Sequence, residues 1–202
     1  EEVLASNESG RPIVITGTAG SGKSTSLMRL GLELSAKGIP TYWIDERSNL
    51  EPHRLRELAL STEDPVAILV DDAYLFGRTA SAWARELPQI RPKVLLACAV
   101  RSSKVDGLLD KDTLGGIGPY EISMPHLSDA DIDGLIEVLD KENRLGILKG
   151  KAHNERVAAF QKEAGRQLLV AMIQATFGIR FTEKAIQEFK ELPDRQRLLY
   201  AI

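Results

Sequence analysis

The chain has 202 residues, of which 43% are hydrophobic and 27% charged, and its formal net charge is −3. This balance excludes wholesale disorder, and the small negative charge gives no general attraction to nucleic acid or anionic lipid. No run approaches the ~18 apolar residues of a membrane span, and the one cysteine, Cys98, lies in an apolar run that fits a buried thiol in a reducing cytoplasm.

Short apolar runs alternate with helical patterns in the first part of the chain. The expected strands are residues 13–16, 41–44, 66–70, 93–100 and 120–123. Helical spacing follows the first strand from about Gly22 to a stop at Lys37-Gly38, and further helices are expected over 50–60 and 73–87. Strands that alternate with helices form right-handed βαβ units, so the pattern predicts a parallel α/β sheet.

The pattern changes to helices alone after Pro125. Ser128 and Asp131 have the spacing of a capping box, and apolar residues at helical spacing follow them. The further helices are expected around residues 157–164, 168–178 and 186–189.

This change divides the chain into an α/β core, residues 1–124, and a helical subdomain, residues 125–202. The chain begins with Glu1-Glu2 and ends on the apolar run 198–202, whereas chain ends are usually polar. We therefore expect a segment of a longer protein, cut before a following domain.

The motif G-x-x-x-x-G-K-[ST] of a phosphate-binding loop is matched from Gly17 to Ser24, directly between a strand and a helix. Its glycines let successive N–H groups point at phosphate oxygens, and the helix N-terminus adds positive partial charge. We expect Lys23 to reach the β- and γ-phosphates of ATP or ADP and the Ser24 hydroxyl to ligate Mg²⁺. The predicted nucleotide-binding residues of this loop are Gly17, Thr18, Ala19, Gly20, Ser21, Gly22, Lys23, Ser24 and Thr25.

Two aspartates follow the apolar strand 66–70. Asp71 stands where a P-loop fold places the carboxylate that holds Mg²⁺ through water, and Asp72 is the candidate to orient or deprotonate the attacking water. Alternatively, both residues begin a solvated turn and cap the next helix. Because aspartate reaches one methylene less than the glutamate commonly used at the second position, we expect slow hydrolysis.

Arg101 follows the fourth strand. If that strand lies between the first and the third, its carboxyl end faces the γ-phosphate, which a guanidinium could sense by bidentate bonding. The alternative is an exposed arginine that opens a polar loop. The nearby segment Ser103-Lys104-Val105-Asp106 resembles the guanine-reading motif [NT]-K-x-D, but its first residue is serine, and Tyr74 stands where D-x-x-G requires glycine. ATP is therefore favoured over GTP.

The segments Gly17–Thr25 (GTAGSGKST), Leu69–Asp72 (LVDD) and Leu95–Arg101 resemble the STAND NTPases, the signal-transduction branch of the AAA+-like P-loop ATPases that includes NACHT and NB-ARC proteins. A double aspartate after the Walker B strand and an arginine after the next strand are typical of that branch. The segment 165–178 looks like the lid helix of prokaryotic members, many of them linked to antiphage defence. We expect a parallel five-stranded P-loop NTPase sheet of ASCE type, in the order 5-1-4-3-2, with flanking helices and a C-terminal helical lid.

The resemblance also implies a mode of action. Known members bind ADP in a closed form, exchange it for ATP when a sensor region is triggered, and oligomerise to activate an effector domain. Their lid helix often carries Gly-x-Pro, whose proline packs near the adenine, whereas this chain has Gly165-Arg166-Gln167. Arg166 could instead reach the phosphates as a second sensor, or could be an exposed arginine at a helix start.

Our hypothesis from the sequence is an ATP/ADP-binding regulatory switch with slow or regulated Mg²⁺-dependent hydrolysis, which forms a homo-oligomer through flanking domains. Two other classes remain open. A small-molecule P-loop kinase needs a second substrate pocket and usually an arginine-rich lid, and a motor or loader acting on nucleic acid needs basic, aromatic-bearing loops. Neither feature stands out in the sequence, so nucleic acid is not expected as a partner. A membrane is not expected either, because no apolar run is long enough to span one.

Overall fold

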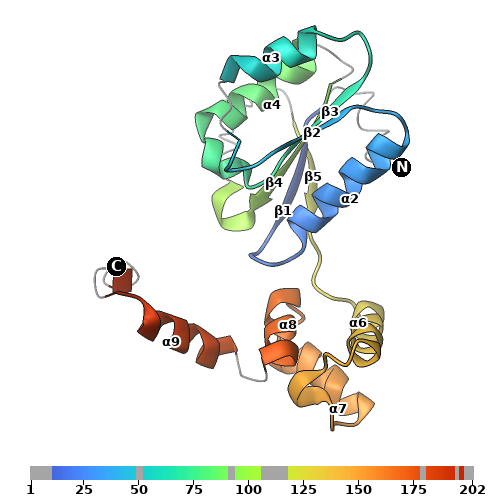
Figure 1. The fold of residues 1–202 in the computed structure, drawn as a ribbon, viewed down its shortest axis with the longest axis vertical. Coiled ribbons are helices and arrows are strands. Elements are labelled where there is room, and N and C mark those ends of the chain that lie inside the picture. Colours follow the sequence, from blue (N-terminus) through green and yellow to red (C-terminus); the bar gives the residue numbers. More distant parts are fainter. Residues whose placement is uncertain are drawn as a thin grey trace. The chain divides into compact units, whose positions relative to one another are not determined.

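The computed structural model divides into two compact units, Glu1–Pro125 and His126–Ile202 (Figure 1). The structure describes residues 11–48, 52–90, 94–105, 118–177, 181–193 and 196–197.

The first unit is built on one five-stranded, all-parallel sheet. Its strands are β1 (Ile13–Gly17), β2 (Thr41–Ile44), β3 (Val66–Val70), β4 (Val94–Arg101) and β5 (Tyr120–Ser123). The order across the sheet is β2-β3-β4-β1-β5, which is the expected 5-1-4-3-2 read from the other edge. Strand β4 therefore lies between β1 and β3, and the carboxyl ends of these three strands meet at one edge of the sheet.

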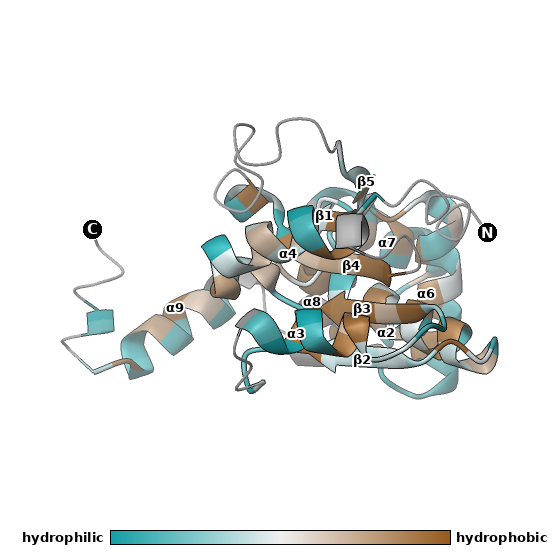
Figure 2. Ribbon diagram, turned by 90° about the horizontal axis from the view of Figure 1, so that it is seen from above, coloured by the Kyte–Doolittle hydropathy of each residue, from teal (hydrophilic) through white to brown (hydrophobic). Residues whose placement is uncertain are grey.

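Helices cover both faces of this sheet (Figure 1). They are α2 (Lys23–Ala36), α3 (Pro52–Leu60) and α4 (Arg78–Ile90). Leu27 and Leu34 of α2 belong to one apolar cluster, whereas residues of α3 and α4 such as Leu55 and Trp83 belong to a second one. The side chains of β4 alternate between these clusters, so every position from Val94 to Val100 is buried. Figure 2 accordingly shows β3 and β4 as the hydrophobic centre of the sheet.

The helix expected over residues 73–87 is two elements. A 3₁₀ turn, η1 (Ala73–Phe76), follows β3, and α4 begins only at Arg78. Between them Gly77 has φ 51° and ψ −129°, a conformation outside the α-helical region and closed to most residues with a Cβ. The prediction of one continuous helix was therefore wrong at Gly77.

The second unit is helical. It comprises α6 (Asp129–Lys141), a 3₁₀ turn η3 (Gly146–Leu148), α7 (His153–Ala158), a π turn η4 (Ala159–Glu163), α8 (Leu168–Phe177) and α9 (Phe181–Glu191). Ile132, Ile136 and Phe160 are among the buried residues of its core. Among the helices of the described ranges, none combines the length and apolar character that crossing a membrane requires.

Candidate functional site

The turn between β1 and α2 presents backbone N–H groups. Gly20 and Gly22 have φ values of 67° and 91°, in the left-handed region that favours glycine. Gly22 is the N-cap residue of α2, and no side chain caps that end of the helix. Because glycine has no side chain, the N-cap residue supplies no acceptor to the first N–H groups of α2, and the positive end of the helix dipole faces the same place. This arrangement suits an anion such as a nucleotide phosphate.

Gly17, at the end of β1, is packed tightly against Ser21 of the loop and against Met124, which follows β5. A Cβ added to Gly17 would lie 2.5 Å from Ser21 Oγ and 2.9 Å from Met124 Cβ, so no larger residue fits there without movement. The Ser21 hydroxyl is buried, and no hydrogen-bond partner for it is found among the described residues. Thr18, Ala19 and Gly20, at the tip of the loop, are exposed, as is Thr25 in the first turn of α2.

Lys23 lies buried inside this loop, with only 7% of its surface exposed. Its amine donates a hydrogen bond of 2.7 Å to the carbonyl oxygen of Thr18. Burial lowers the pKa of Lys23 below its ordinary 10.5, the charge of Arg101 lowers it further, and the carboxylates of Asp72 and Asp71 act in the opposite direction. A buried ammonium group beside the amides of the loop is a second reason to expect a polyanion here.

Ser24 and Asp71 meet across the mouth of the loop. The Ser24 hydroxyl donates to Asp71 Oδ1 at 2.9 Å, and the backbone N–H of Asp72 donates to the same oxygen at 3.0 Å. Mg²⁺ prefers oxygen ligands and is usually held by one or two carboxylates together with phosphate and water. The hydroxyl and carboxylate present would therefore fit a magnesium ion that accompanies a nucleotide. Within the described residues, no group of three or more His, Cys, Asp and Glu side chains is arranged as a metal site.

Asp72 adopts a left-handed conformation, with φ 42° and ψ 48°. Aspartate tolerates this region better than most residues, although the conformation carries some strain. Its carbonyl oxygen accepts from the N–H of Leu75 at 2.9 Å, which starts η1. Asp72 is also the carboxylate that raises the pKa of Lys23 most, so its charge acts directly on the loop lysine.

Arg101 lies at the carboxyl end of β4, where it is the register partner of Gly17 in β1. Its guanidinium carbon lies 5.6 Å from the centroid of the Tyr74 ring, a cation–π distance. The structure thus brings Lys23, Asp71, Asp72 and Arg101 together around the phosphate loop. Sequence reasoning missed Tyr74, which drew attention only as the residue that breaks a GTPase motif. Asp106, the last residue of that motif, lies outside the described residues.

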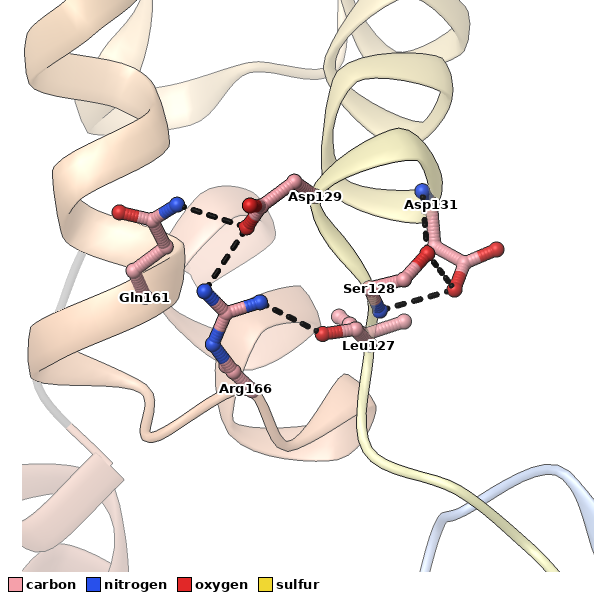
Figure 3. Close-up of polar contacts among 6 residues, drawn as sticks. All are labelled: Leu127, Ser128, Asp129, Asp131, Gln161 and Arg166. Atoms are coloured by element: carbon pink, nitrogen blue, oxygen red, sulfur yellow. Dashed lines mark hydrogen bonds and ion pairs between the residues drawn. The ribbon is translucent and has the colours of Figure 1, made fainter.

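Arg166 belongs to the second unit, and Figure 3 shows its contacts there. Its guanidinium pairs with the carboxylate of Asp129 at 2.8 Å and donates to the carbonyl oxygen of Leu127 at 3.0 Å. Gln161 donates to the same carboxylate at 2.9 Å. These bonds join the start of α6 to the turn that contains Arg166, whose φ is 59°. A phosphate contact of Arg166 stays a prediction.

Ser128 begins α6 with the expected capping box, also drawn in Figure 3. Its hydroxyl accepts from the N–H of Asp131 at 3.1 Å, and the Asp131 carboxylate accepts from the N–H of Ser128 at 2.9 Å. Hydrogen bonds from the side chain and backbone of Ser128 lower the pKa of Asp131.

Comparisons with known proteins agree with this architecture. The model of the family described as Novel STAND NTPase 5 matches residues 1–111. No curated protein matches the chain.

Among solved structures, the Aeropyrum pernix Orc1 protein in complex with DNA is 16% identical, with 86% of this chain and 56% of that chain covered and a TM-score of 0.53. The AMPPCP-bound DnaA from Aquifex aeolicus is 17% identical, with 93% and 65% covered and a TM-score of 0.52. The Thermotoga maritima RuvB Holliday junction branch migration motor is 14% identical, with 86% and 56% covered and a TM-score of 0.55. This chain therefore spans 56% to 65% of the length of these structures, and at such identities the likeness concerns the fold.

Proposed function

Since the chain belongs to the Novel STAND NTPase 5 family, we propose that it is an ATP/ADP-binding switch domain with slow, Mg²⁺-dependent ATP hydrolysis. The observation that carries the proposal is the meeting of four groups at the carboxyl ends of β1, β3 and β4. These groups are the loop amides, the buried amine of Lys23, the Ser24–Asp71 pair and the guanidinium of Arg101. Each of them favours negatively charged oxygen or the cation that accompanies it.

The residues divide the work of binding and hydrolysis. The loop amides and Lys23 would bind the β- and γ-phosphate oxygens, while Ser24 and Asp71 would hold magnesium. When bound, magnesium neutralises charge on the phosphates. In hydrolysis a water oxygen forms a bond to the γ-phosphorus, the bond from that phosphorus to the β–γ bridging oxygen breaks, and ADP leaves. Asp72 would accept a hydrogen bond, and then a proton, from that water.

Slow hydrolysis suits a switch better than a motor. Asp72 has a side chain one methylene shorter than the glutamate commonly used at this position, and its backbone is in the left-handed region, so we expect it to activate water slowly. Arg101 would distinguish ATP from ADP by contact with the γ-phosphate. From the resemblance to STAND NTPases, we further propose nucleotide exchange, homo-oligomerisation through flanking domains and a role in antiviral defence in the cytoplasm.

Calorimetric titration of the chain with ATP, ADP and GTP, each with magnesium, tests the proposal. We expect micromolar or tighter binding of ATP and ADP, and its loss in Lys23→Ala. Lys37→Ala is the matched control, because Lys37 is exposed at the opposite end of α2. Absence of uptake at millimolar nucleotide, or an unchanged affinity of Lys23→Ala, would refute nucleotide binding.

A second candidate function comes from the similar structures, since the Aeropyrum pernix Orc1 protein was solved in complex with DNA and the Thermotoga maritima RuvB protein is a Holliday junction branch migration motor. An ATPase that acts on DNA should hydrolyse ATP faster when single-stranded or branched DNA is added. We expect turnover of the chain to be slow and unaffected by either DNA. Strong stimulation by DNA would favour this second function over the switch, and Asp72→Asn should abolish the turnover in both cases.

A further inference from the structure

We propose that Tyr74 is a positioning residue that holds the guanidinium of Arg101 beside the phosphate loop and thereby sets how strongly the domain prefers ATP to ADP. The inference rests on the proposed nucleotide binding. It adds a residue from outside every motif used to recognise the site, and it predicts a property of nucleotide discrimination that the loop residues alone do not determine.

The contact joins two elements that are distant in sequence and adjacent in space. Arg101 is the last residue of β4, and Tyr74 lies in η1, directly after β3. Because β3 and β4 are parallel neighbours, their carboxyl ends lie side by side. The separation of 5.6 Å between the Arg101 guanidinium carbon and the ring centroid is within the ~6 Å range of cation–π attraction.

Arg101 needs such a support. Its side chain is exposed, and its charge lowers the pKa of Lys23, so the two cations repel each other. Among the described residues, the ring of Tyr74 is the partner that the structure shows for the guanidinium. An arginine without a partner would spread over many rotamers, away from Lys23, and would lose that freedom on binding phosphate. Contact with the Tyr74 ring restricts the Arg101 side chain before phosphate binds.

The position of Tyr74 is itself fixed by contacts with the core. Tyr74 is partly buried and packs against the apolar cluster formed with α3 and α4. Its carbonyl oxygen accepts from the N–H of Gly77 at 3.2 Å, which closes the turn. Two residues on, the ring of Phe76 lies 5.4 Å from that of Trp83, which anchors the turn to α4. The aromatic ring that contacts Arg101 is therefore attached to the core.

Loss of the Tyr74 ring should change the affinity for ATP and the affinity for ADP differently. The loop amides and Lys23 would contact the β-phosphate, which ATP and ADP share, as well as the γ-phosphate, whereas a guanidinium at the end of β4 contributes only when a γ-phosphate is present. Removal of the ring should therefore weaken binding of the triphosphate and leave ADP affinity unchanged.

The experiment measures the dissociation constants of ADP and of AMPPCP, a triphosphate analogue that resists hydrolysis, by calorimetry on the full chain with magnesium. Tyr74→Leu keeps apolar volume and removes the aromatic face, and Tyr74→Phe keeps the face and removes the hydroxyl. We expect the ratio of the ADP to the AMPPCP constant to fall about two- to fivefold in Tyr74→Leu and to stay unchanged in Tyr74→Phe. Leu75→Ala, at an exposed neighbour in the same turn, is the matched control.

A double-mutant cycle shows whether the effect acts through Arg101. Arg101→Ala should lower the ratio at least as much as Tyr74→Leu, and the double variant should show no additional loss. An unchanged ratio in Tyr74→Leu, an equal loss in Tyr74→Phe, or additive losses with Arg101→Ala would overturn the inference while nucleotide binding stands. If the wild-type chain bound neither nucleotide, the proposed function would fail, and this inference with it.

Discussion

Replacement of Gly17 by alanine tests how tightly the start of the phosphate loop is packed against the segment that follows β5. The added Cβ would lie 2.5 Å from Ser21 Oγ and 2.9 Å from Met124 Cβ. Ordinary contacts between carbon atoms are about 3.5–4.0 Å, so both distances are too short. Gly17 is not among the glycines with positive φ, so alanine can adopt its backbone conformation and the effect arises from these contacts.

The two contacts are not equally easy to relieve. The Ser21 hydroxyl can rotate about χ1, whereas Met124 Cβ is fixed to the backbone, so β1 or the segment after β5 must shift. Overpacking of this kind costs about 1–3 kcal/mol, and the smaller unfolded-state entropy of alanine offsets about 0.4–1 kcal/mol. We expect Gly17→Ala to destabilise the first unit by about 1–2 kcal/mol and to weaken ADP binding.

Unfolding by denaturant, followed by tryptophan fluorescence, measures the stability of the first unit. The two tryptophans of the chain, Trp43 and Trp83, both lie in the first unit, so the signal reports its unfolding. Gly118→Ala is the control, because its added Cβ would lie 3.4 Å from Arg11 Nη2, an ordinary contact. If Gly17→Ala were as stable as Gly118→Ala, the close approach of Met124 would be refuted. Ser21→Ala in the Gly17→Ala background should restore part of the stability, because one contact remains.

Four further predictions concern ionisation and helix stability. A bound polyphosphate favours the charged form of Lys23, whose pKa lies below the ordinary 10.5, so ADP affinity should fall as the pH rises through that pKa. Calorimetry should then show proton uptake on binding. An ADP affinity that stays constant up to pH 10.5 would contradict this prediction. Burial raises the pKa of Cys98 to about 12, so the native thiol should resist alkylation at mildly alkaline pH until the unit opens, as mass spectrometry can show. Ser128→Ala removes the N-cap of α6 and should lower the stability of the second unit by about 1 kcal/mol in thermal unfolding followed by circular dichroism. Gly134→Ala, in α6 with nothing within 4 Å of the added Cβ, should raise that stability by about 0.5–1 kcal/mol in the same assay.

The sheet was predictable because its signal is local. β2, β3 and β5 have the expected bounds, β1 and β4 each end one residue later than expected, and residue 93, the expected start of β4, lies outside the described residues. In β4, successive side chains enter opposite apolar clusters, so the sequence must be apolar throughout, and such a run between polar residues has few other solutions. The strand order followed from family resemblance, since periodicity says nothing about which strands are neighbours.

Breaks within helical stretches were not predictable in the same way. Residues 73–87 have apolar spacing compatible with one helix, and one glycine is tolerated in many helices. The break depends on the conformation of Gly77, which follows from how η1 packs on the core. Likewise, the π turn η4 is closed by a bond from Ala164 N–H to the carbonyl oxygen of Ala159 at 3.0 Å, and the apolar spacing at 157–164 fits an α-helix equally well.

Within the candidate site, too, some residues could be predicted from the sequence and others could not. A motif that wraps phosphate leaves little choice of residue type, so Lys23, Ser24 and Asp71 could be named from the sequence, and the structure brings them together. Arg101 could be placed at the correct strand end, because strand ends in a parallel sheet share an edge. Its aromatic partner could not be found in this way. Many residue types are compatible with the position of Tyr74, and its contact with Arg101 depends on the turn η1, which follows β3 beside the end of β4. Residues that hold a charged group, unlike the charged group itself, therefore have to be sought in the turns that follow its neighbouring strands.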